Sequence, residues 1–126
     1  MGYRMSELMT VSTDLADTLK DAGIPAFPTL PNRITPPVAV VQAGSPFLSQ
    51  GGSFGEFKSR WDITLVTPTG ANDVSTEKLY VLLEDSIVAL VNSKYSIEEV
   101  SKPYALEANN ATYVAIDLKI YNNVRI

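Results

Sequence analysis

The alternating segment FKSRWDITLVT at residues 57–67 decides the fold of this 126-residue chain. Its odd-numbered positions from 57 to 65 are mostly apolar, and its even-numbered positions from 58 to 64 are polar or charged. A period of two is typical of a strand with one face in the core and the other in water. The segment therefore predicts a half-buried strand, with Trp61 in the core and a mixed-charge outer face.

Three other segments predict strands around this one. The run VAVVQA at 38–43 is short and β-branched, which favours a strand buried on both faces. Residues 112–121 alternate cleanly, whereas residues 95–106 alternate with a break that indicates a bulge. We expect the last two strands to pair antiparallel through a turn at Asn109 and Asn110.

Two segments have the period of a helix. Residues 6–22 place apolar side chains on one face, and Gly23 and Pro25 then end the pattern. Residues 73–93 carry a longer stripe, which we expect to face the core: Leu79, Leu82, Leu83, Ile87, Leu90 and Val91, widened by Val81 and Val88.

These elements predict an α+β fold in the order α-β-β-α-β-β. We expect a small mixed four-stranded sheet, with two helices packed on one face, in a single domain over residues 1–126. Residues 24–37 contain five prolines and form a Pro-rich connector. This connector is interpreted as an extended segment that crosses the surface, and an arm that touches a neighbouring subunit is the alternative.

Residues 44–56 (GSPFLSQGGSFGE) predict a flexible loop, because four glycines and a proline punctuate them. The segment also holds Phe47, Leu48 and Phe54. Large apolar groups on a mobile loop are costly to leave in water, so they indicate a binding surface. The equally open alternative is that these side chains fold back onto the core of the domain.

The composition excludes several kinds of chemistry. The chain has no cysteine and no histidine, which removes thiolate nucleophiles, imidazole bases and zinc sites of the Cys/His type. The net charge of −4 argues against general binding to nucleic acid or to anionic membranes. No phosphate loop or converging carboxylate pair is visible, and no targeting segment. The sequence thus predicts a protein that is not an enzyme and has no cofactor and no metal.

The chain also resembles the tail terminator, or tail completion, proteins of long-tailed siphovirus-type phages. The resemblance rests on strand and turn patterns and covers most of the chain from Val38 onward. It is carried by VAVVQAGSPF at 38–47, by WDITLV at 61–66 leading through NDVSTE at 72–77 into the helix, and by PYAL at 103–106 with Asn109 and YVA at 113–115.

This resemblance implies a non-enzymatic virion protein of the tail or neck, assembled in the host cytoplasm. Such proteins form a homo-hexameric ring that caps the tail tube, ends tail polymerisation and joins the head. The implied partners are further copies of the chain, the major tail tube protein and a head-completion or stopper protein. DNA would pass through the lumen without specific binding, and no membrane is involved.

Six residues are the candidates for interaction: Phe47, Leu48, Phe54, Lys58, Arg60 and Asp62. The first three lie in the predicted loop, and the last three lie on the mixed-charge face of the segment 57–67. Two other functions stay open. One is a different head-tail connector or stopper protein of the phage neck, and the other is a small non-catalytic ligand-binding α+β domain.

Overall fold

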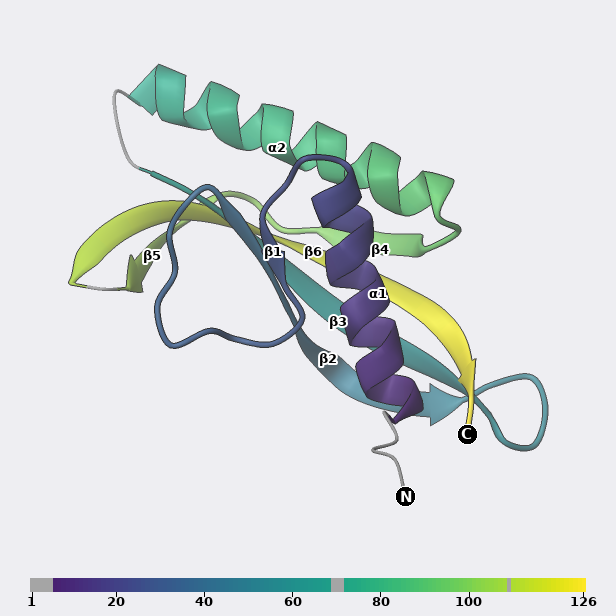
Figure 1. Ribbon diagram of the computed structural model, residues 1–126. Helices are drawn as coiled ribbons and strands as arrows, with labels where there is room; N and C mark the ends of the chain where they lie inside the picture. Colours follow the sequence, from purple (N-terminus) through teal and green to yellow (C-terminus); the bar gives the residue numbers. More distant parts are fainter. Residues whose placement is uncertain (1–5, 69–71, 109) are drawn as a thin grey trace.

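The computed structural model describes residues 6–68, 72–108 and 110–126 (Figure 1). Within these residues the chain forms two helices and a six-stranded mixed sheet, so the predicted α+β class is confirmed. The elements are α1 (Glu7–Asp21), β1 (Ala26–Phe27), β2 (Val38–Gln50), β3 (Glu56–Thr67), α2 (Asn72–Asn92), β4 (Ser96–Val100), β5 (Tyr104–Ala108) and β6 (Ala111–Arg125).

The sheet has the order β1-β2-β3-β6-β4, and β5 also pairs with β6. The β1–β2 pair is parallel, and the other pairs are antiparallel. Strands β3 and β4 therefore run in the same direction on either side of β6. The final strand of the chain lies in the middle of the sheet, where it gains partners along both edges.

The prediction of four strands was wrong at two places. The Pro-rich connector contributes β1, a two-residue strand at the sheet edge. The single strand predicted for residues 95–106 is two strands that pair with the same edge of β6, one after the other. Between them, Ser101 donates its N–H to the Asp117 carbonyl oxygen at 2.8 Å, and Pro103 has no N–H to continue the ladder. The predicted bulge is confirmed by a register shift between Ile97 and Glu99.

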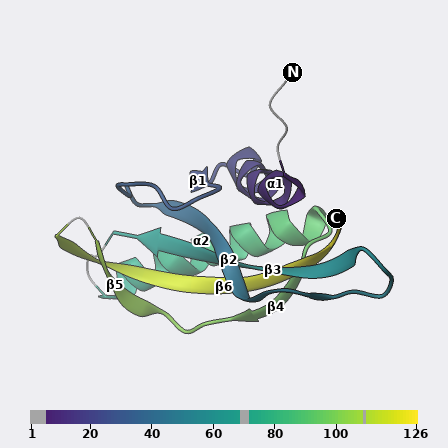
Figure 2. The same cartoon turned by 90° about the horizontal axis from the view of Figure 1, so that it is seen from below.

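Both helices pack on one face of the sheet, as predicted (Figures 1 and 2). Helix α1 begins at the N-cap Ser6, whose hydroxyl oxygen accepts a hydrogen bond of 3.0 Å from the Met9 N–H. It ends before Gly23, whose φ of 86° suits glycine. Its buried Leu15 and Leu19 meet Ile63 and Leu65 of β3 in one core cluster.

The predicted stripe of α2 is only partly buried. Leu79 and Leu90 are fully buried, and Leu82, Leu83 and Ile87 pack against the same core. Three other members of the stripe are about half exposed, which contradicts the expectation that they face the core: Val81, Val88 and Val91. A helix that lies on one side of a sheet can bury only the stripe that faces the sheet, and these valines fall beyond it.

A second, smaller cluster lies on the face of the sheet opposite the helices. Val38, Val40 and Val66 form it together with Ala115 and Ile34 of the connector. Ala39 and Val41 point to the helix side, so the prediction that the strand at 38–43 is buried on both faces is confirmed for residues 38–41, whereas Gln42 and Ala43 are exposed.

The predicted loop at 44–56 is mostly strand. Strand β2 continues to Gln50 after a register shift between Ala43 and Leu48, and β3 already begins at Glu56. Only residues 51–55, called the hairpin tip below, connect them. Pairing with β3 resumes at Leu48 after the shift, although the glycines and the proline suggest a loop in the sequence. Strand β6 likewise extends to Arg125, where it pairs with Glu56.

Candidate functional site

The described residues hold no group of three or more His, Cys, Asp or Glu side chains that could bind a metal ion. Among the same residues, no helix is long and apolar enough to cross a membrane. The features that stand out are surfaces: the hairpin tip, the outer face of the sheet, and a groove at one end of that face.

The six candidate residues lie in three different environments. Phe47 folds back onto the core, where its ring meets the Trp61 ring edge-on at a centroid distance of 5.0 Å. Leu48 is half-buried and pairs with Ser59. The alternative of folding back onto the core is therefore confirmed for Phe47, Leu48 is only half-buried, and Phe54 is exposed to water.

The hairpin tip presents Phe54 to solvent while its backbone is held in place. The Phe54 side chain is 97% exposed. Its carbonyl oxygen accepts a hydrogen bond of 2.9 Å from Arg125 Nη1, and Arg125 Nη2 donates to Ser53 Oγ at 3.1 Å. Glu56 adds a carboxylate that accepts from the Gly52 N–H at 3.0 Å. Hydrogen bonds from Arg125 and to Glu56 thus hold the backbone of the tip, while the Phe54 ring is exposed to solvent.

Two glycines of this segment are required by the geometry of the turn. A Cβ atom at Gly51 would come within 2.7 Å of the Glu56 carbonyl oxygen, which the Gly51 N–H approaches to form a hydrogen bond. Gly55 has a φ of 77°, a conformation that other residues adopt at a cost. The glycines that suggested mobility in the sequence instead allow a tight turn.

Lys58, Arg60 and Asp62 lie together on the outer face of β3, which neither helix covers. Lys58 Nζ is 4.0 Å from the centroid of the Tyr121 ring. Arg60 donates to Ser49 Oγ at 3.1 Å and lies 3.6 Å from Glu98 Oε2. On the mixed-charge face predicted from the sequence, Lys58 and Arg60 therefore contact side chains of neighbouring strands of the same sheet.

A polar network occupies the middle of this face. Asp117 Oδ1 accepts hydrogen bonds from Thr64 Oγ1 at 2.8 Å and from the Tyr104 hydroxyl at 3.0 Å. Burial, and then the Asp117 carboxylate, raise the pKa of Tyr104 to about 12. Burial also raises the pKa of Asp62, and the Asp117 charge adds to this while Lys119 opposes it. The neutral Tyr104 hydroxyl donates to the Asp117 carboxylate, and the raised pKa keeps this hydroxyl neutral further into the alkaline range.

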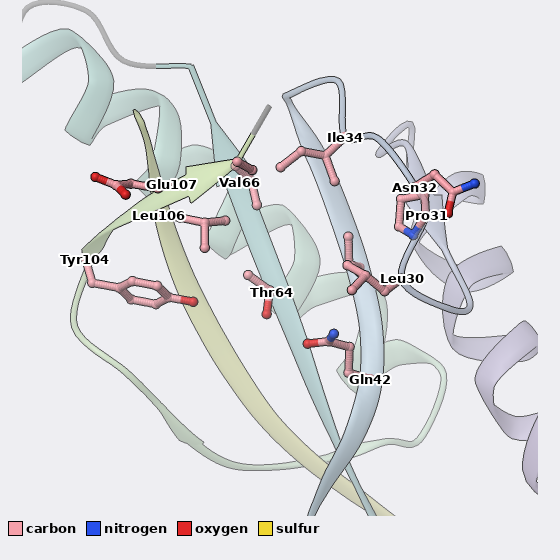
Figure 3. A pocket seen from close by; sticks show the side chains of 12 residues that line it. Leu30, Pro31, Asn32, Ile34, Gln42, Thr64, Val66, Tyr104, Leu106 and Glu107 are labelled. Atoms are coloured by element: carbon pink, nitrogen blue, oxygen red, sulfur yellow. The ribbon is translucent and has the colours of Figure 1, made fainter. Parts of the chain in front are cut away.

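Beyond this network lies a groove between the connector and β5 (Figure 3). This β5 groove has a volume of about 430 Å³. Its floor is apolar, with Val40 and Val66 buried, while Leu106 and Leu30 flank it from opposite sides. Polar groups line its rim, including Gln42 and Thr64. Figure 3 shows Asn32 and Glu107 pointing away from the cavity at its two sides.

Several residues of these surfaces were not among the candidates. The predicted strand at 112–121 stops short of Arg125, and Tyr104 lies in the predicted strand at 95–106, whose alternation is broken. The alternation of residues 112–121 continues with Val124, which is buried, so the pattern could have extended the strand towards Arg125. No local signal places Leu30 of the connector opposite Leu106 of β5, because their positions on two sides of the groove depend on the sheet order.

A scan for known protein families finds no match to the chain, and a search of curated proteins finds no significant match.

Proposed function

We propose that the protein is a structural component of a phage virion that forms a ring, caps the tail tube and contributes to the joint between tail and head. The proposal starts from the resemblance of residues 38–115 to tail terminator proteins. The observation that carries it is the fixed hairpin tip with its 97% exposed Phe54, together with a groove on a distant part of the same chain. Two different surfaces on one protomer permit heterologous contacts, which can close into a ring.

The outer face of the sheet supports an interface made by side chains. Its charged residues already have partners across the strands, such as Arg60 with Glu98 and Lys119 with Glu99. A neighbouring copy can pack on such a surface without leaving an isolated buried charge. Acidic Glu98 and Glu99 also lie on β4, an edge strand, where charge discourages open-ended strand pairing.

The charge balance suits a ring through which DNA moves. A net charge of −4 gives the phosphate backbone no broad attraction to the protein. In this proposal the chain has no specific contact with DNA, and its partners are its own copies, the tail tube protein and a head-completion or stopper protein.

Electron microscopy of phage tails assembled with and without the protein tests the function. We expect tails of uniform length, capped at one end, when the protein is present, and overlong or polymerised tubes when it is absent. Tails of normal length that carry a head in its absence would contradict termination. Tails of normal length to which no head attaches would favour the alternative of a connector or stopper protein.

A matched pair of variants tests the outer face. Reversing the charge with Arg60→Glu places two carboxylates beside each other, and the double variant Arg60→Glu with Glu98→Arg restores a pair in the opposite order. We expect ring formation, measured by mass in solution and on tails, to fall in the single variant and to recover in the double variant. Equal ring formation in all three proteins would exclude these charges from the interface.

The β5 groove favours one other function, that of a small non-catalytic ligand-binding domain. Its volume and its apolar floor with a polar rim fit the general pattern of small-molecule sites. Native mass spectrometry of the purified protein checks this alternative. A bound small molecule lost on the substitution Leu106→Arg would support it over a purely structural role.

A further inference from the structure

We propose that the β5 groove receives Phe54 from the hairpin tip of a second copy of the chain. The inference deepens the proposed ring and rests on it, because it names the contact that joins one protomer to the next. In this arrangement each groove is incomplete until a neighbouring copy supplies the aromatic side chain.

The hairpin tip has the properties of a preformed insert. The Phe54 ring is almost entirely in water, although burial of an apolar side chain of this size is favourable. The backbone beneath it is fixed by Arg125 and Glu56, so little conformational freedom remains to be lost on binding. A rigid, exposed aromatic residue is the kind of side chain that dominates binding energy at interfaces.

The β5 groove has the matching properties of a receptor. Its buried floor of Val40 and Val66 is apolar, and a cavity of about 430 Å³ lies within the size range of ligand sites. Leu30 at its edge is 64% exposed, so a ring that enters the groove would cover this side chain as well. The Tyr104 ring on the opposite side can offer an edge or a face to an incoming aromatic group.

The charges beside the two parts are complementary. Arg125 adjoins Phe54 at the tip, where it lies 3.8 Å from Glu56 Oε2; its side chain is 64% exposed and that of Glu56 is 30% exposed, so Arg125 is the more accessible of the two charges. Glu107 lies at the rim of the groove, exposed and directed away from the cavity. An inserted tip would bring a cation towards this carboxylate, which favours the correct orientation of the two copies.

The tip cannot enter the groove of its own chain. Glu56 adjoins the tip, and Val66 in the floor of the groove lies ten positions further along β3. At about 3.3 Å per residue, this separates the two parts by roughly 30 Å. Figure 1 shows the β2–β3 connection and β5 at opposite ends of the sheet. The contact is therefore between copies and head-to-tail, the geometry that closes into a ring or extends into a filament.

The contact alone is small for a stable complex. One aromatic side chain buries about 150–250 Å², whereas a specific interface buries about 1,200–2,000 Å² in total. The insertion thus acts as an anchor within a larger interface that includes the outer face of the sheet. We expect weak self-association of the free protein and a stable assembly on a tail tube.

Cross-linking tests the pairing, because the chain has no cysteine of its own. One preparation carries Ser53→Cys at the tip, another carries Asn32→Cys at the groove, and a short bismaleimide links the mixed proteins. We expect a heterodimer joined between these two positions, identified by mass spectrometry of the linked peptides. A preparation with Glu84→Cys, on the exposed face of α2, is the control and should link at least tenfold less.

Substitutions then separate the two halves of the contact. Phe54→Ala in the Ser53→Cys protein should lower the linked yield about tenfold or more, since a factor of ten corresponds to 1.4 kcal/mol. Leu30→Lys in the Asn32→Cys protein should have a similar effect through repulsion of Arg125. Phe54→Tyr keeps an aromatic ring and should retain most of the yield. Circular dichroism confirms that each variant is folded.

The outcomes distinguish this contact from the proposed function. No link above the control at protein concentrations up to about millimolar, or an unchanged yield with Phe54→Ala, overturns the insertion; rings that still form on tails would then leave the capping function standing. A specific link that depends on Phe54, in a protein without which tails are still normal, would keep the contact and overturn the capping function.

Discussion

The ring of Phe47 stands at 87° to the ring of Trp61, with 5.0 Å between the two centroids. This edge-on contact joins the outer half of β2 to the core under α1, across the register shift that follows Ala43. Trp61 is fixed in turn, since its Nε1 donates a hydrogen bond of 3.0 Å to the buried Ser59 Oγ. The glycine-rich segment is therefore anchored to the core through an aromatic pair.

Removal of this contact should destabilise the fold. Phe47 is half-buried, so Phe47→Ala should lower the free energy of unfolding by about 2 kcal/mol, below the cost for a fully buried phenylalanine. Urea unfolding followed by tryptophan fluorescence measures the change, because Trp61 is the chain's single tryptophan.

Phe54→Ala is the matched control for this measurement. The two phenylalanines lie seven positions apart, but the Phe54 side chain touches almost nothing in the free chain. We expect a change in the free energy of unfolding within about 0.5 kcal/mol. Equal losses for the two variants would contradict the distinct roles that the structure gives them.

Arg125 should control the order of the hairpin tip. Arg125→Ala removes the donors to the Phe54 carbonyl and to Ser53 Oγ, so backbone amides of residues 51–55 should exchange hydrogen faster. The global free energy of unfolding should fall by less than about 1 kcal/mol, because the pair with Glu56 is exposed. Exchange measured by mass spectrometry gives the local effect.

Arg125→Lys separates charge from geometry in the same experiment. Lysine keeps the cation but lacks the planar fork that reaches Ser53 and Phe54 together. Its exchange rates should fall between those of the wild type and Arg125→Ala. Wild-type exchange rates in both variants would show that the turn is fixed by its backbone hydrogen bonds alone.

Asp62 should destabilise the fold when it is ionised. Burial raises the pKa of Asp62 in the folded state above 3.8. The contribution of the neutral carboxyl to the free energy of unfolding is therefore complete below pH 3.8 and is lost as the pH rises through the higher folded pKa. Asp62→Asn should therefore raise the free energy of unfolding at pH 7, by less than about 1 kcal/mol because solvent screens this partly exposed group. The gain should vanish near pH 3.

Glu84→Gln, on the exposed face of α2, is the control for Asp62→Asn. It should change the free energy of unfolding little at pH 7 and at pH 3 alike, as an isolated surface substitution does. A loss of stability in Asp62→Asn at pH 7 would mean that the attraction to Lys119 outweighs the cost of burial.

The sequence predicted the parts of the fold that depend on local period. The alternation of residues 57–65 and 112–121 identified the two central strands, and the helical stripes identified α1 and α2. The extent of burial was less predictable: Val88 belongs to the stripe by spacing, but it is 59% exposed, because burial depends on how much of α2 the sheet can cover.

The surfaces depended on contacts that no local pattern contains. Phe47 and Phe54 occupy equivalent-looking places in a glycine-rich run, yet the register shift sends one to the core and leaves the other at the tip. The β5 groove needs the connector on one side and β5 on the other, which only the sheet order brings together. The residue types of Phe47 and Phe54 made them candidates in the sequence. Whether each side chain is buried or exposed depends on the register of β2 and on the sheet order.

The exposed valines of α2 allow a test of how far spacing along the helix predicts burial. Val88→Ala should raise the free energy of unfolding by about 0.3–0.7 kcal/mol, since alanine has the higher helix propensity and little buried contact is lost. Leu79→Ala, in the buried part of the same helix, should lower it by about 2–5 kcal/mol. A clear loss with Val88→Ala, measured by urea unfolding of the dilute protein, would contradict the exposure of that face.

Tyr104 should make stability sensitive to alkaline pH. Its pKa is about 10 in an unfolded chain and is raised to about 12 in the fold, by burial and by the hydrogen bond to Asp117. The stability that the neutral hydroxyl contributes is thus complete below pH 10 and is lost as the pH rises from 10 to 12. Tyr104→Phe cannot ionise, so its free energy of unfolding should fall less steeply over this range.

Tyr95, whose pKa is raised by burial and by Asp14, accounts for part of the remaining slope, and Tyr95→Phe with Tyr104→Phe should flatten it further. Equal slopes for Tyr104→Phe and the wild type, in urea unfolding from pH 9 to pH 12, would contradict this role for the Tyr104–Asp117 pair.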